Sequence, residues 1–156
     1  MDTVGIFGLS TPKDLLDKLR HDFNVLKNHE TAYAAFNFFV TAEHLVDWLH
    51  PQDRTEREAL RGDPLLALVS HLANGAKHFG PLNKRHVSAK NTKMLGGYFN
   101  TSYFPQRYFG RYFGAGRRLG VTLDGTAAAV FGQSMAAVDL AEKVLAYWEQ
   151  PGRIIT

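Results

Sequence analysis

Sixty consecutive residues of this chain, from position 64 to position 123, contain neither aspartate nor glutamate. The same stretch carries nine lysines or arginines and three histidines. Residues 1–63 hold seven basic and eleven acidic side chains, and residues 124–156 hold two and four. The cations of the middle stretch must therefore face carboxylates elsewhere in the fold, or an anionic partner. Nucleic acid is the commonest partner of that kind.

Length and composition indicate one globular domain that spans residues 1–156. Hydrophobic residues make up 45% of the chain and charged residues 21%, as is ordinary for a soluble protein. There is no cysteine, so disulfides and thiolate chemistry are excluded. The first residues lack the features of a signal peptide, and no apolar run is long enough to span a membrane. We therefore expect a cytoplasmic protein.

Capping residues and apolar side chains at helical spacing predict four helices. Thr11-Pro12 and Asp63-Pro64 each combine an N-cap residue with proline at the first helical position. Ser134 is expected to cap the last helix. The predicted helices span about residues 12–28, 30–49, 64–80 and 134–149.

The pattern between the third and fourth helices is not helical. It is rich in glycine, and the pair Tyr-Phe occurs four times. Residues 119–123 and 126–131 flank Asp124-Gly125, which predicts a β-hairpin with a type I′ turn. The predicted fold class is thus mainly α, a four-helix bundle with a β-hairpin excursion between helices 3 and 4. The helical core covers about residues 11–80 and 133–150, and the basic aromatic excursion about residues 81–131.

The third helix carries the best candidates for chemistry. His71, Asn74 and His78 are spaced so that they line one stripe of this helix. Two imidazoles can act as general base and general acid, a combination that cleaves RNA through its 2′-hydroxyl without a metal. We therefore take His78, His71 and Asn74 as candidate catalytic residues.

The segment Asn74-Gly75-Ala76-Lys77-His78 resembles half of the HEPN superfamily motif, Arg-Asn-x-x-x-His, which lies on the third helix of a helical bundle. Many HEPN proteins are metal-independent ribonucleases of toxin–antitoxin and phage-defence systems. The resemblance implies a HEPN-like protein that acts on RNA. It covers the helices only, not residues 81–131.

The match is incomplete because the motif arginine is missing. Ala73 occupies its position in one register and His71 in the register with a longer spacer. Two interpretations stay open: RNA binding by a catalytically inactive relative, or cleavage in which His71 takes part.

Two further interpretations concern the same residues. In one, His71, Asn74 and His78 are hydrogen-bonded packing residues that face His44 and Asp47 of the second helix. In the other, the histidines and Asp47 ligate a metal ion. Two ligands seven positions apart lie about 10 Å apart along a helix axis and do not easily reach one ion. We therefore predict no metal and no cofactor.

The middle stretch also combines cations with aromatic rings. Phosphate neutralisation and base stacking together bind single-stranded nucleic acid without reading its sequence. The candidate phosphate-binding residues are Lys77, Arg107, Arg111, Arg117 and Arg118. In the alternative interpretation, half of the Tyr-Phe rings pack onto the bundle or into a homodimer interface.

The sequence therefore predicts a homodimeric, HEPN-like nucleic-acid-binding protein with RNA as its partner. It is either a metal-independent ribonuclease or an inactive relative of one. The alternative function is non-enzymatic: a protein–protein interaction or adaptor domain that uses the Tyr-Phe segment as its contact surface.

Overall fold

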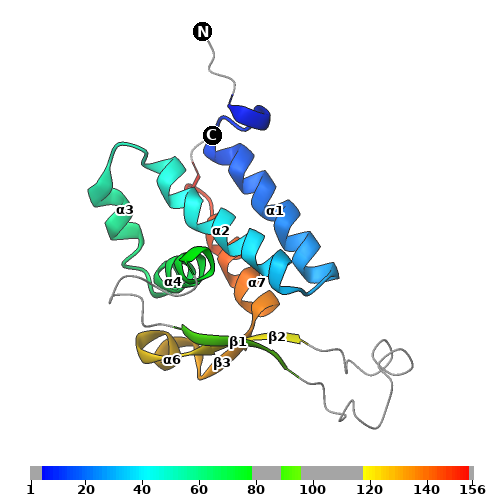
Figure 1. Cartoon of the computed structure of the whole chain (residues 1–156). Coiled ribbons are helices and arrows are strands. Elements are labelled where there is room, and N and C mark those ends of the chain that lie inside the picture. Colours follow the sequence, from blue (N-terminus) through cyan, green and yellow to red (C-terminus); the bar gives the residue numbers. More distant parts are fainter. Residues whose placement is uncertain (1–4, 79–88, 96–117, 155–156) are drawn as a thin grey trace.

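The computed structural model describes residues 5–78, 89–95 and 118–154. The protein is mainly helical with a small antiparallel sheet (Figure 1). The sheet lies at one end of the helices, beneath α4 and α7 in Figure 1. The helices are α1 (Pro12–Asn28), α2 (Ala32–Leu49), α3 (Arg54–Leu60), α4 (Pro64–His78), α6 (Gly125–Phe131) and α7 (Ala137–Trp148), preceded by a 3-10 turn at Ile6–Gly8.

Helix α1 begins where the sequence predicts, and its start is fixed by local hydrogen bonds. The hydroxyl of Thr11 accepts a hydrogen bond from the backbone N–H of Asp14 at 3.2 Å. The Asp14 carboxylate accepts one from the backbone N–H of Thr11 at 2.8 Å. This reciprocal capping box satisfies two donors that the first turn would otherwise leave free. Pro12 at the first helical position adds a preset φ angle.

Helix α2 is the central element of the core. It contacts α1, α4 and α7, and half of its residues are buried. Thr31 caps it by accepting a hydrogen bond from Ala34 N at 3.2 Å, so the helix begins at Ala32 rather than at residue 30 as predicted. Within the described ranges, no helix is both long and apolar enough to cross a bilayer.

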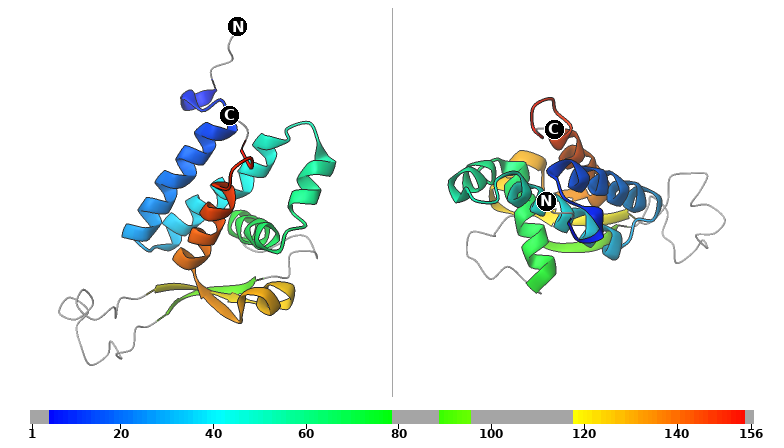
Figure 2. Two further views of the ribbon diagram at one scale, coloured as in Figure 1. Left: turned by 180° about the vertical axis from the view of Figure 1, so that it is seen from behind. Right: turned by 90° about the horizontal axis from the view of Figure 1, so that it is seen from above.

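The core is built by all four long helices and the middle strand. Figure 2 shows α1, α2 and α7 lying together, with α4 crossing beside them. The largest completely buried side chains are Trp148, Phe38, Leu19, Leu26, Leu45, Leu66, Leu68, Leu140, Val46, Val69, Val121 and Val144. Burial of these side chains supplies the main favourable free energy of folding.

The sheet has three strands in the order β1-β2-β3, with β1 (Ala89–Leu95), β2 (Arg118–Leu123) and β3 (Ser134–Ala136). Both pairings are antiparallel. Leu119, Val121 and Leu123 alternate along β2 and are all buried in the core. This period of two makes β2 the strand that attaches the sheet to the helices.

The predicted β-hairpin at residues 119–131 is wrong in its second half. The first strand is present as β2, but residues 125–131 form helix α6. The carboxylate of Asp124 accepts a hydrogen bond from Gly125 N at 2.9 Å and caps this helix. Asp-Gly serves equally as a hairpin turn and as a helix start, and the alanines that follow favour the helix. Strand β2 pairs instead with β1 and β3.

The predicted start of the last helix at Ser134 is also wrong. Ser134 belongs to β3 and is paired with Thr122 of β2. Helix α7 starts three residues later, and its N-cap, Ala136, makes no side-chain capping bond. Strand pairing therefore occupies the residues that the sequence pattern assigned to the first helical turn.

Candidate functional site

The predicted catalytic stripe lies on α4, which begins where the sequence indicates. The carboxylate of Asp63 accepts a hydrogen bond from Leu65 N at 2.8 Å, and Pro64 is the first helical residue. Leu66, Leu68 and Val69 are buried and hold α4 against the core. Ser70 and Lys77 of α4 contact Glu43 and His44 of α2.

The three candidate catalytic residues have different environments. His71 is buried, with 4% of its surface exposed. Asn74 is partly buried, and its amide Nδ2 donates to the carbonyl oxygen of Ser70 at 2.8 Å. His78 is the last residue of α4, and its side chain lies outside the described part of the structure. The Asn74 amide is thus engaged by the preceding helical turn, and the His71 side chain is covered by its neighbours.

A buried carboxylate, Glu43 of α2, lies next to α4. Its Oε1 atom accepts hydrogen bonds from Arg61 Nε at 2.8 Å and from the Ser70 hydroxyl at 3.2 Å. Its Oε2 atom is buried and has no hydrogen-bond partner among the described residues. Burial raises the pKa of Glu43, although the charge of Arg61 opposes this shift.

A chain of polar side chains runs from this buried carboxylate to the surface. Arg61 Nη2 lies 2.9 Å from Oδ1 of Asp47. Asp47 Oδ2 lies 3.5 Å from Nδ1 of His44, one helical turn away. His44 Nε2 in turn lies 3.1 Å from the ammonium of Lys77 on α4. These five connected residues form what we call the α2–α4 polar cluster: Glu43, Arg61, Asp47, His44 and Lys77.

The charge of the cluster keeps Asp47 ionised. Burial opposes ionisation of this carboxyl, but the hydrogen bond and charge of Arg61 outweigh it and lower the pKa of Asp47. Arg57 adds a second guanidinium, with Nε 3.6 Å from Oδ1 of Asp47.

Arg57 of helix α3 and Arg61, the residue that follows this helix, both contact Asp47 of α2. None of the α3 residues is buried. Besides its contact with Asp47, Arg57 donates from Nη1 to the backbone oxygens of His50 at 2.7 Å and Pro51 at 3.0 Å. The two arginines therefore fix the position of α3 beside the α2–α4 polar cluster.

Sequence reasoning found part of this cluster. It placed His44 and Asp47 opposite the third helix and selected Lys77, but it missed Glu43 and Arg61, and also Ser70, which donates a hydrogen bond to Glu43. The available signal was Glu43 itself, a carboxylate in a helix that is apolar around much of its circumference. Arg61 had no comparable signal, because it lies in a charged, exposed segment of the sequence.

The predicted phosphate-binding residues are only partly described. Lys77 is exposed, and among the described residues it makes no ion pair with a carboxylate. Arg118 lies at the start of β2, where Nη2 is 3.0 Å from Oδ1 of Asp139 and Nε is 3.7 Å from Oε2 of Glu30. Arg107, Arg111 and Arg117 lie outside the described residues. Part of the acid-free stretch thus meets carboxylates from elsewhere in the fold.

Of the described side chains considered as metal ligands, the structure brings one pair together. His44 and Asp47 lie together, but no group of three or more histidines, aspartates or glutamates in the described ranges has metal-binding geometry. His71, a third candidate ligand, is buried in α4.

The chain matches no protein-family profile, no curated protein and no solved structure.

Proposed function

We propose that this protein is a HEPN-like RNA-binding protein whose binding surface includes the exposed face between α2 and α4. The contact between Lys77 and His44 carries the proposal. Lys77 lies in the segment that resembles the HEPN motif, and its exposed ammonium contacts an imidazole rather than a carboxylate. A cation in this position is available to neutralise a phosphate.

Arg118 contributes less directly to this surface. Its guanidinium already faces Asp139 and Glu30, so a phosphate would compete with two carboxylates. The HEPN-like four-helix bundle, the homodimer and the cytoplasmic location belong to the same proposal. Lys77, together with the arginines at 107, 111 and 117, would provide the phosphate contacts.

Salt dependence tests this proposal. Binding of a labelled single-stranded RNA is measured at about 50 and about 200 mM salt, with single-stranded DNA of the same sequence alongside. For three or more phosphate contacts, RNA affinity should fall roughly tenfold or more between the two conditions. Absence of RNA binding at the lower salt concentration would refute the proposal.

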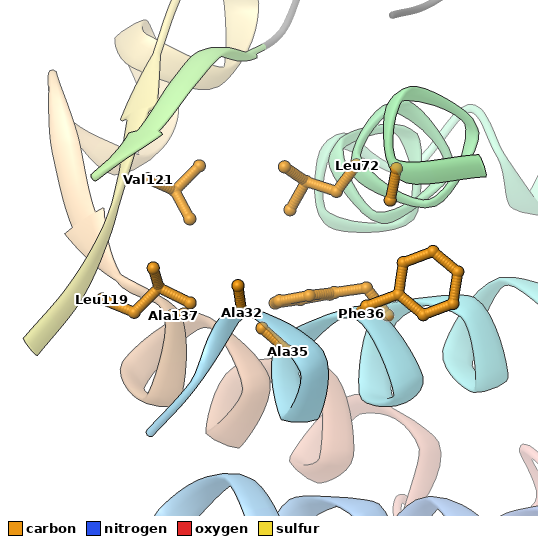
Figure 3. A pocket seen from close by; sticks show the side chains of 9 residues that line it. Ala32, Ala35, Phe36, Leu72, Leu119, Val121 and Ala137 are labelled. Atoms are coloured by element: carbon orange, nitrogen blue, oxygen red, sulfur yellow. The ribbon is translucent and has the colours of Figure 1, made fainter. Parts of the chain in front are cut away.

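A second candidate function, protein–protein interaction, is favoured by an apolar hollow of about 240 Å³. Figure 3 shows Ala32, Ala35 and Phe36 of α2 on one side of it, with Leu72 of α4 and Val121 of β2 facing them. The remaining lining residues are Phe39, Ala76, Leu119 and Ala137. Nearby on α2, Tyr33 is 85% exposed and Phe36 is 41% exposed, as suits a contact with a second copy of this chain.

Light scattering separates this candidate from RNA binding. Phe36→Ser with Tyr33→Ser should convert a dimer into a monomer without weakening RNA binding at the α2–α4 polar cluster. A wild-type protein that is monomeric at high concentration would contradict the proposed homodimer.

A further inference from the structure

Two adjacent apolar side chains near the N-terminus are almost completely exposed. Ile6 is 82% exposed and Phe7 is 96% exposed, the highest value among the large apolar side chains of the described ranges. Apolar surface of this size is unfavourable in water and marks a contact site when it is rimmed by polar residues. We call Ile6 and Phe7 the N-terminal knob.

Hydrogen bonds hold the knob in one conformation. Gly8 N donates to the carbonyl oxygen of Gly5 at 3.0 Å and closes the turn. Gly5 N donates to the Ser10 hydroxyl at 3.0 Å, and Ser10 N donates to the Asp14 carboxylate at 2.9 Å, which ties the turn to α1. Phe7 has a φ angle of 61°, a left-handed conformation that costs free energy for a phenylalanine. Strain of this kind is typical of residues whose side chain is held for a contact.

The apolar hollow between α2, α4 and β2 has the size and chemistry to accept the knob (Figure 3). All nine residues that line it have apolar side chains, so these side chains offer no hydrogen bond to a phosphate or a charged group. A dry cavity of about 150 Å³ binds benzene. The hollow measures about 240 Å³ and therefore accommodates the phenyl ring of Phe7 with part of Ile6.

The knob cannot reach the hollow of its own chain. The segment from Phe7 to Pro12 spans at most about 18 Å when fully extended. Helix α1 has 17 residues and is about 25 Å long, and the hollow lies beyond its far end, where α2 begins with Ala32. Figure 1 shows the N-terminal turn at one end of the helices and the sheet at the other. A knob that fills the hollow therefore belongs to a second copy.

The charges of the chain favour such a pairing. The knob belongs to residues 1–63, which hold seven basic and eleven acidic side chains. The α4 and β2 walls of the hollow belong to residues 64–123, which hold nine lysines or arginines and no acidic residue. Two copies that lie antiparallel bring each knob to the hollow of the other copy and an acidic segment to a basic one. The same contact is then made twice, and the dimer is closed.

We propose that the N-terminal knob of each copy fills the apolar hollow of its partner in a two-fold dimer, with Phe7 as the anchor. This inference rests on the second candidate function, contact with a second copy at the hollow, and it names the segment that fills the hollow. Tyr33 and Phe36, which are exposed beside the hollow, extend the apolar contact around the inserted ring.

Analytical ultracentrifugation over a range of protein concentrations tests the knob and the hollow separately. Phe7→Asn removes the ring, and asparagine tolerates the left-handed conformation of the turn. Ala76→Leu fills the hollow from an exposed position of α4 with a good helix former. Each change should raise the dimer dissociation constant about 100-fold or more, because two apolar contacts are lost.

Matched variants control for the loss or gain of exposed apolar surface. Val130→Asn removes another exposed apolar side chain, and Ala129→Leu makes the same exchange as Ala76→Leu at an exposed position of α6. Both should leave the dissociation constant unchanged. Ala32→Leu fills the hollow from α2 and replaces Ala76→Leu if that variant does not keep the wild-type melting temperature.

A mixture of the two variants tests whether the contact is reciprocal. A dimer of one Phe7→Asn chain and one Ala76→Leu chain has one intact knob facing one intact hollow, whereas each variant alone has no such pair. Native mass spectrometry with one variant labelled with ¹⁵N distinguishes the mixed dimer by its mass. We expect mixed dimers in excess of both homodimers, with a dissociation constant about tenfold or more above that of the wild type.

The outcomes separate this inference from the proposed function. A dimer that survives Phe7→Asn but is lost in Tyr33→Ser with Phe36→Ser would overturn the knob and leave self-association at the hollow intact. A mixture in which mixed dimers are no more abundant than homodimers would also overturn it. A wild type that stays monomeric at high concentration would overturn both, whether or not the protein binds RNA.

Discussion

The guanidinium of Arg61 lies 2.8 Å from Oε1 of Glu43, a carboxylate that is 94% buried (6% exposed) between α2 and α4. Arg61 comes from the turn that follows α3, so this contact joins that turn to α2, and the hydrogen bond from Ser70 to the same oxygen adds α4. It also places the charge that holds Asp47 ionised, and through Asp47 it positions His44.

Removing Arg61 should therefore destabilise the protein strongly. Arg61→Ala leaves the buried Glu43 carboxylate without its cation, and the free energy of unfolding should fall by about 3 kcal/mol. Urea unfolding monitored by circular dichroism measures this change. Arg54→Ala removes the exposed pair with Glu58 and should cost less than about 0.5 kcal/mol. Equal effects of the two variants would mean that the Glu43 contact is not structural.

The raised pKa of Glu43 predicts the sign of a pH effect. The usual pKa of this carboxyl is 4.5. At pH values between 4.5 and the higher pKa of the folded protein, Glu43 is protonated in the folded state and ionised in the unfolded state. Stability from Glu43 is therefore fully present below 4.5 and is lost as pH rises through the folded-state pKa. The stability of wild type relative to Glu43→Gln should fall as pH rises through this window. The lowered pKa of Asp47 changes stability with pH in the opposite direction. Asp47 is present in both wild type and Glu43→Gln, so its contribution largely cancels in the difference between the two proteins.

Unfolding free energies of wild type and Glu43→Gln, measured from about pH 4 to about pH 7, give this difference directly. A difference that moves in favour of the wild type with rising pH would contradict the predicted sign.

A helix and a strand at residues 125–131 predict opposite effects of one substitution on the free energy of unfolding. Ala129 is exposed in the middle of this helix. Valine is a poorer helix former than alanine but a better strand former, so Ala129→Val should lower the unfolding free energy by about 0.6 kcal/mol. Ala129→Leu should be nearly neutral. Stabilisation by valine would favour the hairpin that the sequence first indicates.

The contact between α1 and α2 includes a buried polar group. Asp22 is 6% exposed, and its Oδ2 accepts hydrogen bonds from Thr41 Oγ1 at 2.7 Å and from Lys18 Nζ. Thr41→Val removes one of these donors and should lower the unfolding free energy by about 1–2 kcal/mol. Thr55→Val, at an exposed position of α3, should change it by less than about 0.5 kcal/mol in the same urea experiment.

The starts of α1 and α4 were predictable because their signals are local. The hydroxyl of Thr11, the ring of Pro12 and the carboxylate of Asp14 act within one turn, so the start of α1 needs no tertiary information. The Asp124-Gly125 pair is different, since the same two residues start a hairpin turn or cap a helix. Only the pairing of β2 with β1 and β3 decides between these outcomes.

The candidate site was predictable only in part, for a similar reason. Lys77 was selected from its place in a motif, and His44 from its position on the neighbouring helix. The link between Glu43 and Arg61 spans 18 positions and a change of chain direction, so no periodic pattern reveals it. Whether His71 is buried depends on how α4 packs against the other helices. The spacing of His71, Asn74 and His78 shows that they share one side of the helix, but it does not show whether that side faces solvent.

The most direct test of the central claim compares RNA binding by two single variants, Lys77→Ala and Lys143→Ala, across a series of salt concentrations. Both remove one exposed lysine, but only Lys77 adjoins His44. If Lys77 contacts a phosphate, its loss should weaken binding and reduce the slope of log affinity against log salt by about 0.7, while Lys143→Ala behaves like the wild type. Equal affinities and equal slopes for the two variants, or no RNA binding by the wild type at about 50 mM salt, would contradict the account.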